Sequence, residues 1–91
     1  MHFDERQVIA GYPQVRQGAR GVYVCVLQDA LNTVGFRTGG LDGIFGAQTN
    51  NGVRNYQQSR GLDVDGIVGN ITWNKLMSEV VGNGSTSTTI N

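Results

Sequence analysis

Two acidic residues stand at equivalent places in a repeated phrase, and paired carboxylates are the first candidates for chemistry in this chain. The phrase LDGIFGAQT covers residues 41–49, and VDGIVGNIT covers residues 64–72. Asp42 and Asp65 would be the acid and base of a glycosidase if they flanked one sugar bond. Aspartate before glycine is also the usual composition of a tight turn, in which the carboxylate binds its own downstream backbone. We therefore expect two structural corners and keep both aspartates as candidate ligand contacts.

Other catalytic and metal-binding arrangements lack the residues that they require. His2 is the sole histidine and stands at the start of the chain, so no serine or cysteine nucleophile has a histidine held beside it by a structured core. Structural zinc takes four protein ligands, and one histidine with one cysteine, Cys25, falls short. The run DVDG at residues 63–66 suits a calcium loop, but Thr72 stands at the twelfth position in place of glutamate. We expect no cofactor, no metal and no catalysis.

Glycine pairs mark the elements that must position these corners. The spacing Gly-x-x-Gly occurs at residues 18–21, 43–46 and 66–69, each time before a candidate helix, which indicates a third, eroded copy of the repeat. Within each corner we expect the isoleucine to point inward and the threonine to reach an unpaired amide in the first helical turn. Apolar residues after the first pair have the three- and four-residue spacing of a helix with one buried face: Val24, Leu27, Leu31 and Val34.

Two glycines predict where the first two helices end. Gly35 can take the left-handed conformation just past a helix, and Phe36 follows where an apolar contact back to the last turn is usual. Gly61 and Leu62 repeat this arrangement. We therefore expect two helices that end in the same way.

The second and third helices complete a small all-α, three-helix bundle. The second, over residues 47–60, has few apolar residues besides Val53 and Tyr56, so only tertiary contacts would hold it. Gly52 in its middle costs about 1 kcal/mol relative to alanine, which is understandable if another backbone passes close by. The third helix, over residues 70–81, has one apolar face made of Trp73, Leu76 and Val80.

With these elements in place, residues 12–77 resemble the peptidoglycan-binding domain family, the three-helix cell-wall modules of bacterial and phage lytic enzymes. The resemblance rests on GARGVYVCVLQDALNTVGF, then LDGIFGAQTNNGVRNYQQSRGL, then VDGIVGNITWNKL, in order and at compatible spacing. It implies a non-catalytic module that binds peptidoglycan and anchors a cell-wall hydrolase. The alternative is a protein-interaction or pro-region-like module that packs on a partner enzyme, which extra apolar residues on an outer face would favour.

Four further residues are candidates for the binding surface. Gln28 and Gln57 each follow a core residue within a helix, so each amide either binds a neighbouring loop or contacts the ligand. Tyr23 would stack on a sugar ring, and Arg54 would bind a carboxylate of the stem peptide or of muramic acid. Trp73 has the helical spacing of a core residue, and we interpret it as one.

The charge balance limits the class of partner. Seven basic and seven acidic residues give a formal net charge of zero. Nucleic acids and anionic membranes are bound largely through clustered positive charge, so we expect neither as a partner. A neutral polymer fits better, and we expect a monomer.

Three segments follow from composition: an N-terminal segment over residues 1–11, the three-helix domain over residues 12–81, and a flexible linker or tail over residues 82–91, rich in Gly, Ser and Thr. The start of the chain has neither the basic residues nor the apolar run of a secretory signal. The resemblance implies an extracellular or cell-wall location, as part of a phage endolysin or of a larger secreted protein.

Overall fold

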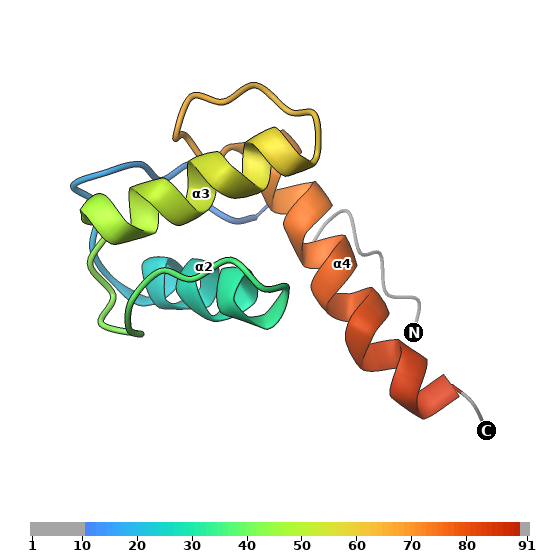
Figure 1. Cartoon of the computed structure of the whole chain (residues 1–91). Helices are drawn as coiled ribbons and strands as arrows, with labels where there is room; N and C mark the ends of the chain where they lie inside the picture. The colour runs from blue at the N-terminus through green and yellow to red at the C-terminus, as the bar shows by residue number, and fades with distance from the viewer. Residues whose placement is uncertain (1–10, 90–91) are drawn as a thin grey trace.

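Three helices joined by loops make up the computed structural model, which describes residues 11–89 and the side chains of residues 11–82. Helix α2 spans Val22–Thr33, α3 spans Ala47–Ser59 and α4 spans Asn70–Thr89. Figure 1 shows α3 lying above α2, with α4 running diagonally past both. The described part of the chain has no strands, only two isolated antiparallel bridges. The expected all-α, three-helix fold is confirmed.

The core lies where one face of each helix meets the others. Trp73 is fully buried, and its indole N–H donates to the carbonyl oxygen of Pro13 at 2.8 Å. Its interpretation as a core residue is therefore correct. The buried apolar side chains are Val15, Val24, Leu27, Ala30, Leu31, Phe45, Val53, Tyr56, Val68, Trp73 and Leu76.

Both expected helix ends are present and have the same hydrogen bonds. Gly35 has a φ of 97° and Gly61 a φ of 73°, so both occupy the left-handed region. The amide of Phe36 donates to the Leu31 carbonyl at 2.8 Å, and the amide of Leu62 donates to the Gln57 carbonyl at 2.9 Å. These are the bonds of a Schellman motif, which satisfies carbonyl groups that a helix end leaves unpaired.

A close backbone contact explains the glycine in the middle of α3. A Cβ atom on Gly52 would lie 2.9 Å from the carbonyl oxygen of Arg37 and 2.9 Å from Cγ2 of Thr38. The loop after α2 therefore packs directly on α3 at this point. The expectation that another backbone passes close to Gly52 is confirmed.

An extended segment before α2 connects the two repeated corners. Val15 exchanges two backbone hydrogen bonds with Val68, at 3.1 and 2.8 Å. A few residues later, the amide of Gly18 donates to Phe45, and the amide of Phe45 donates to Ala19, both at 2.9 Å. One strand-like segment thus holds both corners in place.

Helix α4 continues further than its apolar face predicts. The sequence indicates an end near Val81, and the backbone remains helical to Thr89. Glycine, serine and threonine have low helix propensity, so this extension depends on the turns before it. Residues 1–10, the side chains after residue 82 and residues 90–91 lie outside the described part, so the separate segments over 1–11 and 82–91 stay predictions.

Candidate functional site: two glutamine-clamped corners

The first corner is a tight turn closed by a buried glutamine of α2. Oδ1 of Asp42 accepts the amide of Ile44 at 3.0 Å, and Gly43 has a φ of 73°. Nε2 of Gln28 lies within hydrogen-bonding distance of three acceptors: Oδ1 of Asp42 at 3.0 Å, the Ile44 carbonyl at 3.1 Å and Oγ1 of Thr49 at 3.0 Å. Oε1 of Gln28 accepts the buried amide of Gly43 at 3.0 Å. One side chain therefore ties α2, the turn and the start of α3 together.

The second corner repeats this arrangement with Gln57 of α3. Oδ1 of Asp65 accepts the amide of Ile67 at 2.9 Å. Nε2 of Gln57 lies within hydrogen-bonding distance of three acceptors: Oδ1 of Asp65 at 3.1 Å, the Ile67 carbonyl at 3.0 Å and Oγ1 of Thr72 at 3.2 Å. Oε1 accepts the amides of Asp65 and Gly66, at 3.2 and 3.0 Å. The repeated phrase is therefore one structural unit used twice.

Both corner carboxylates are held in the charged form. The amide of Gln28, together with the backbone N–H of Ile44, holds the pKa of Asp42 below its usual value. For Asp65, the backbone N–H of Ile67 lowers the pKa first, and Gln57 adds to the effect. A glycosidase needs one carboxyl group with a raised pKa as its general acid. Neither aspartate is tuned for that role.

Two details of the corners differ from the sequence expectation. Ile44 is 44% exposed, whereas the next residue, Phe45, is buried. Likewise Val68 is buried and Ile67 only half-buried. The reason is that the extended backbone pairs with residues 15–19, and this pairing turns the residue after isoleucine toward the core.

The corner threonines also act differently from the expectation. Thr49 and Thr72 are buried, and each hydroxyl accepts from a clamping glutamine, as described above. The prediction that these threonines accept an unpaired backbone amide is wrong, because among the described residues each hydroxyl accepts from the glutamine amide instead. The Thr49 hydroxyl also donates to the Ile44 carbonyl oxygen at 3.5 Å.

The remaining candidate residues fall in two places. Arg54 lies at the second corner, where its guanidinium donates to the carbonyl oxygens of Val64 at 3.4 Å and of Asp65 at 3.3 Å. Tyr23 is 40% exposed, and its ring centroid lies 5.5 Å from that of Tyr12. The structure therefore brings Arg54 and Gln57 together at Asp65, whereas Tyr23 contacts Tyr12.

Two open grooves, which sequence reasoning missed, lie beside the helix-stop glycines. The first encloses about 780 Å³, and the second, between the end of α3 and the start of α4, about 730 Å³. The helix stops were visible in the sequence, and each groove includes one of them. The first is lined by Asn32, Gly35, Arg37, Gly39, Gln48 and Asn51. The second is lined by Gln14, Gln57, Gly61, Leu62, Asp63, Asp65, Ile67, Gly69, Asn70, Ile71 and Thr72.

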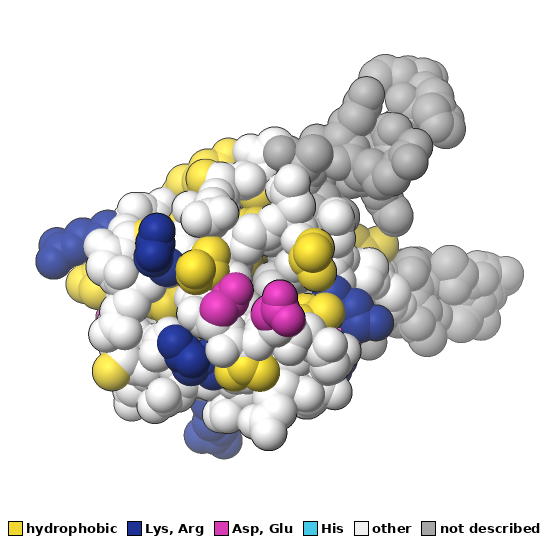
Figure 2. All heavy atoms as spheres, turned by 90° about the horizontal axis from the view of Figure 1, so that it is seen from above, with side chains coloured by type: hydrophobic (Ala, Val, Ile, Leu, Met, Phe, Trp, Pro, Cys, Tyr) yellow, Lys and Arg dark blue, Asp and Glu magenta, His cyan; other side chains and the backbone are white. Residues whose placement is uncertain are grey.

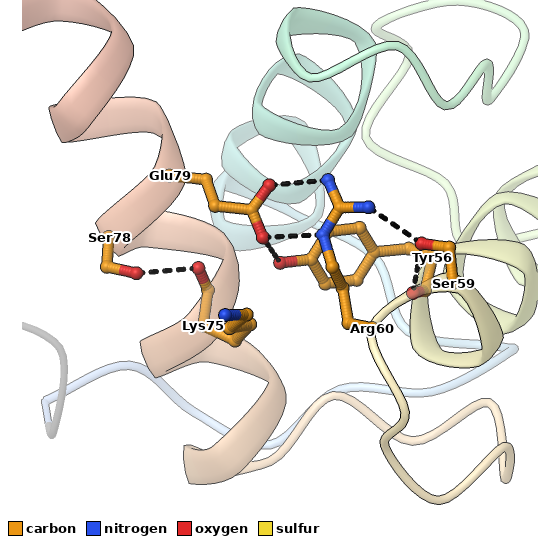
Figure 3. A network of polar contacts seen from close by, with 6 residues as sticks. All are labelled: Tyr56, Ser59, Arg60, Lys75, Ser78 and Glu79. Carbon is orange, nitrogen blue, oxygen red and sulfur yellow. Dashed lines mark hydrogen bonds and ion pairs between the residues drawn. The ribbon is translucent and has the colours of Figure 1, made fainter.

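A polar cluster ties the end of α3 to α4 and was also missed (Figure 3). The guanidinium of Arg60 donates to both carboxylate oxygens of Glu79, at 2.7 and 2.6 Å, and the Tyr56 hydroxyl donates to Glu79 at 2.7 Å. Arg60 also lies over the rings of Phe36 and Tyr56, 5.3 and 4.9 Å from their centroids. Arg60 lowers the pKa of Glu79, and burial beside Glu79 raises the pKa of Tyr56. The cluster is a structural junction between helices.

Among the described residues, no three His, Cys, Asp or Glu side chains lie close enough together to hold a metal ion. None of the described helices is long and apolar enough to cross a membrane.

Comparison with known proteins places residues 20–76 in a protein family described as "Putative peptidoglycan binding domain". A spore cortex-lytic enzyme of Oceanobacillus iheyensis is 41% identical over 63 residues, which are 69% of this chain and 23% of that enzyme. This chain therefore spans about a fifth of the length of the lytic enzyme that it matches.

Solved structures with the same fold include relatives of similar identity. The crystal structure of the SleB N-terminal domain is 39% identical, with a TM-score of 0.73, over 76% of this chain and 94% of that one. The endolysin of Burkholderia AP3 phage is also 39% identical, with a TM-score of 0.68, over 70% of this chain and 24% of the endolysin. The matched region includes both clamped corners, because they lie within residues 20–76.

Proposed function

Since the chain belongs to the peptidoglycan-binding domain family, we propose that it binds bacterial cell-wall peptidoglycan without cutting it and anchors an attached or associated cell-wall hydrolase. The observation that carries this proposal is the family match over residues 20–76, which encloses both corners and all three helix starts. Holding an enzyme on an insoluble polymer raises its local substrate concentration without new contacts at its active site. The module would act outside the cell or at the cell wall.

The chemistry of the corners supports a binding role over a catalytic one. Both aspartates have lowered pKa values, caused chiefly by Gln28 for Asp42 and by the amide of Ile67 for Asp65. The side-chain amides of both clamping glutamines form their hydrogen bonds within the fold. A ligand would therefore contact the outer surface of the corners, which at the second corner includes Arg54 and the second groove.

Sedimentation with insoluble sacculi tests the proposal directly. The purified chain should be retained on sacculi and not on cellulose or chitin, which are neutral control polymers. Equal partition onto all three polymers would reject peptidoglycan binding. Retention should persist between about 0.05 and 0.2 M salt, since a protein held by many phosphate contacts loses several decades of affinity over that range. Release over this range would instead indicate an anionic wall polymer.

A second candidate function is the interaction module that packs on a partner enzyme. The observation that favours it is the exposure of large apolar side chains, above all Ile71 at 72% and Val22 at 67%. Figure 2, which looks down on the molecule from above, shows hydrophobic side chains separated by polar surface, with two acidic side chains side by side among them. Such a scattered distribution is ordinary for a protein surface. If sacculi fail to retain the chain, binding to its own hydrolase should be measured next.

A further inference from the structure

The second groove has an acidic side and no basic lining residue. Asp63 and Asp65 both line it, two residues apart, and none of its lining residues is Lys or Arg. Arg54 is not part of the lining, but its guanidinium donates to the backbone oxygens of Val64 and Asp65, and its charge helps to lower the pKa of Asp65. Asp63 is therefore the main source of negative charge in the groove. The carboxylate of Asp63 is exposed and is therefore available to a ligand. A cationic group complements this side of the groove.

The rest of the groove suits a short peptide. Leu62 and Ile67 are half-buried along its wall, and Ile71 projects from the first turn of α4 with 72% of its surface exposed. Methyl and methylene groups of a ligand would pack against these side chains. The amide side chains of Gln14 and Asn70 also line the groove and offer both donors and acceptors to peptide groups.

The first groove carries a basic residue at the same distance past its helix stop as Asp63 in the second. Arg37 follows the helix-stop Gly35 by two residues, as Asp63 follows Gly61. Both residues line their grooves. The acidic character therefore belongs to the second groove alone and is not required by the repeated fold.

We propose that the groove between the end of α3 and the start of α4 binds the stem peptide of peptidoglycan, with a free side-chain amine of its diamino acid at Asp63 and Asp65. The proposal rests on the proposed function and adds the part of the polymer that is recognised. An ammonium group supplies the complementary charge, the aliphatic chain that carries it packs on Ile71, and the neighbouring peptide bonds meet Gln14 and Asn70. A fully N-acetylated sugar chain offers the acidic side of the groove no such cation.

Chemical acetylation of the wall amines provides the test. Teichoic-acid-free sacculi are divided, one half is N-acetylated with acetic anhydride, and the dissociation constant of the chain is measured on both by sedimentation. Acetylation should weaken binding about tenfold, since it removes the charge and adds bulk. Asp63→Asn should weaken binding to untreated sacculi about three- to fivefold, the size of one partly exposed ion pair. This variant should also lose most of its sensitivity to acetylation.

Asp29→Asn is the matched control, because it removes the same charge from the exposed face of α2, away from the groove. It should bind like the parent, and all variants are first checked for helical circular dichroism. A synthetic lysine-containing stem tripeptide, with its side-chain amine free or acetylated, then separates stem-peptide amines from sugar amines. Only the free form should shift the NMR amide signals of residues 61–72.

Each failure has its own meaning. If the parent chain binds both kinds of sacculi equally, the amine site is wrong while peptidoglycan binding stands. An Asp63→Asn chain that remains fully sensitive to acetylation would place the amine elsewhere, and equal losses from Asp29→Asn and Asp63→Asn would reduce the effect to net charge. If the parent chain binds no sacculi at all, the proposed function itself is rejected.

Discussion

Replacing Gln57 by alanine should strongly destabilise the fold, because this side chain closes the second corner. The substitution leaves the buried amide of Gly66 and the buried hydroxyl of Thr72 without their partner, and it frees the carbonyl of Ile67. A buried polar group without a partner costs about 1–3 kcal/mol. Water can enter beside the part-buried groups, so we expect a total loss of about 2–4 kcal/mol in the free energy of unfolding.

The neighbouring Gln58→Ala variant is the matched control, because Gln58 lies on the same helix with an exposed side chain. It should change stability by less than about 0.5 kcal/mol. Gln57→Met separates the two physical causes, since it keeps the volume of the side chain and removes its hydrogen bonds. If hydrogen bonding dominates, methionine should cost about as much as alanine.

Urea unfolding monitored by the fluorescence of Trp73 measures these differences, because this sole tryptophan is fully buried in the folded chain. A small domain has a denaturant slope of about 1 kcal/mol per molar urea, so the midpoint should fall by about 2–4 M. In thermal unfolding, the same loss corresponds to a decrease of about 10–25 °C for a domain of this size. If Gln57→Ala and Gln58→Ala unfold at the same urea concentration, the corner does not depend on its clamp and our reasoning is wrong.

Three more predictions concern Gly52, the Tyr56 hydroxyl and the two corner aspartates. Gly52→Ala should destabilise the chain by about 1–2 kcal/mol in urea unfolding, although alanine favours a helix by up to about 1 kcal/mol, because the new methyl group meets a backbone oxygen. Tyr56→Phe should lower the free energy of unfolding by about 1 kcal/mol. In a double-mutant cycle with Glu79→Gln, the loss in the double mutant should be smaller than the sum of the two single losses. The pKa values of Asp42 and Asp65 are lower in the folded state than in the unfolded state. Their contribution to stability should therefore be fully present above about pH 4 and be lost as the pH falls through their folded-state pKa values. Urea midpoints measured between pH 6 and 2.5 test this.

Each of these predictions has a control and a contradicting outcome. Asn51→Ala, at an exposed position beside the glycine of α3, should be neutral or slightly stabilising, and a similar gain at Gly52 would contradict the close contact. Additive losses in the double-mutant cycle would mean that the Tyr56 hydroxyl does not interact with Glu79. Replacing Asp42 and Asp65 together by asparagine should make stability less dependent on pH, and an unchanged acid limb would assign it to other carboxyl groups.

Local signals in the sequence were sufficient for the helices and their ends. The apolar spacing of Val24, Leu27 and Leu31 gives α2 its buried face. Helices α2 and α3 each end at a glycine in the left-handed region that is followed by an apolar residue. The same holds for the Asp-Gly turns, whose carboxylates bind an amide two residues downstream. Such features depend on neighbours in the chain, so composition and spacing are enough to predict them.

Contacts between distant residues were decided only by the tertiary structure. The sequence left open whether Gln28 and Gln57 bind a loop or a ligand, and packing brings each amide into contact with its corner, 14 and 8 residues away from Asp42 and Asp65 respectively. The Arg60 fork on Glu79 joins residues 19 positions apart. No local pattern marks such pairs, because their geometry depends on how the helices cross.

By itself, the sequence determined the three helices, the two corners and the resemblance to a family, since turns, helix stops and apolar faces are encoded within a few residues of one another. The tertiary structure decided which residue of each corner faces inward: Phe45 and Val68, in place of the isoleucines before them. It also decided the charge of each groove, by placing Arg37 in one and Asp63 in the other. The physical reason is that an extended backbone takes its facing from the segment it pairs with, here residues 15–19, and that pairing forms only when the chain folds.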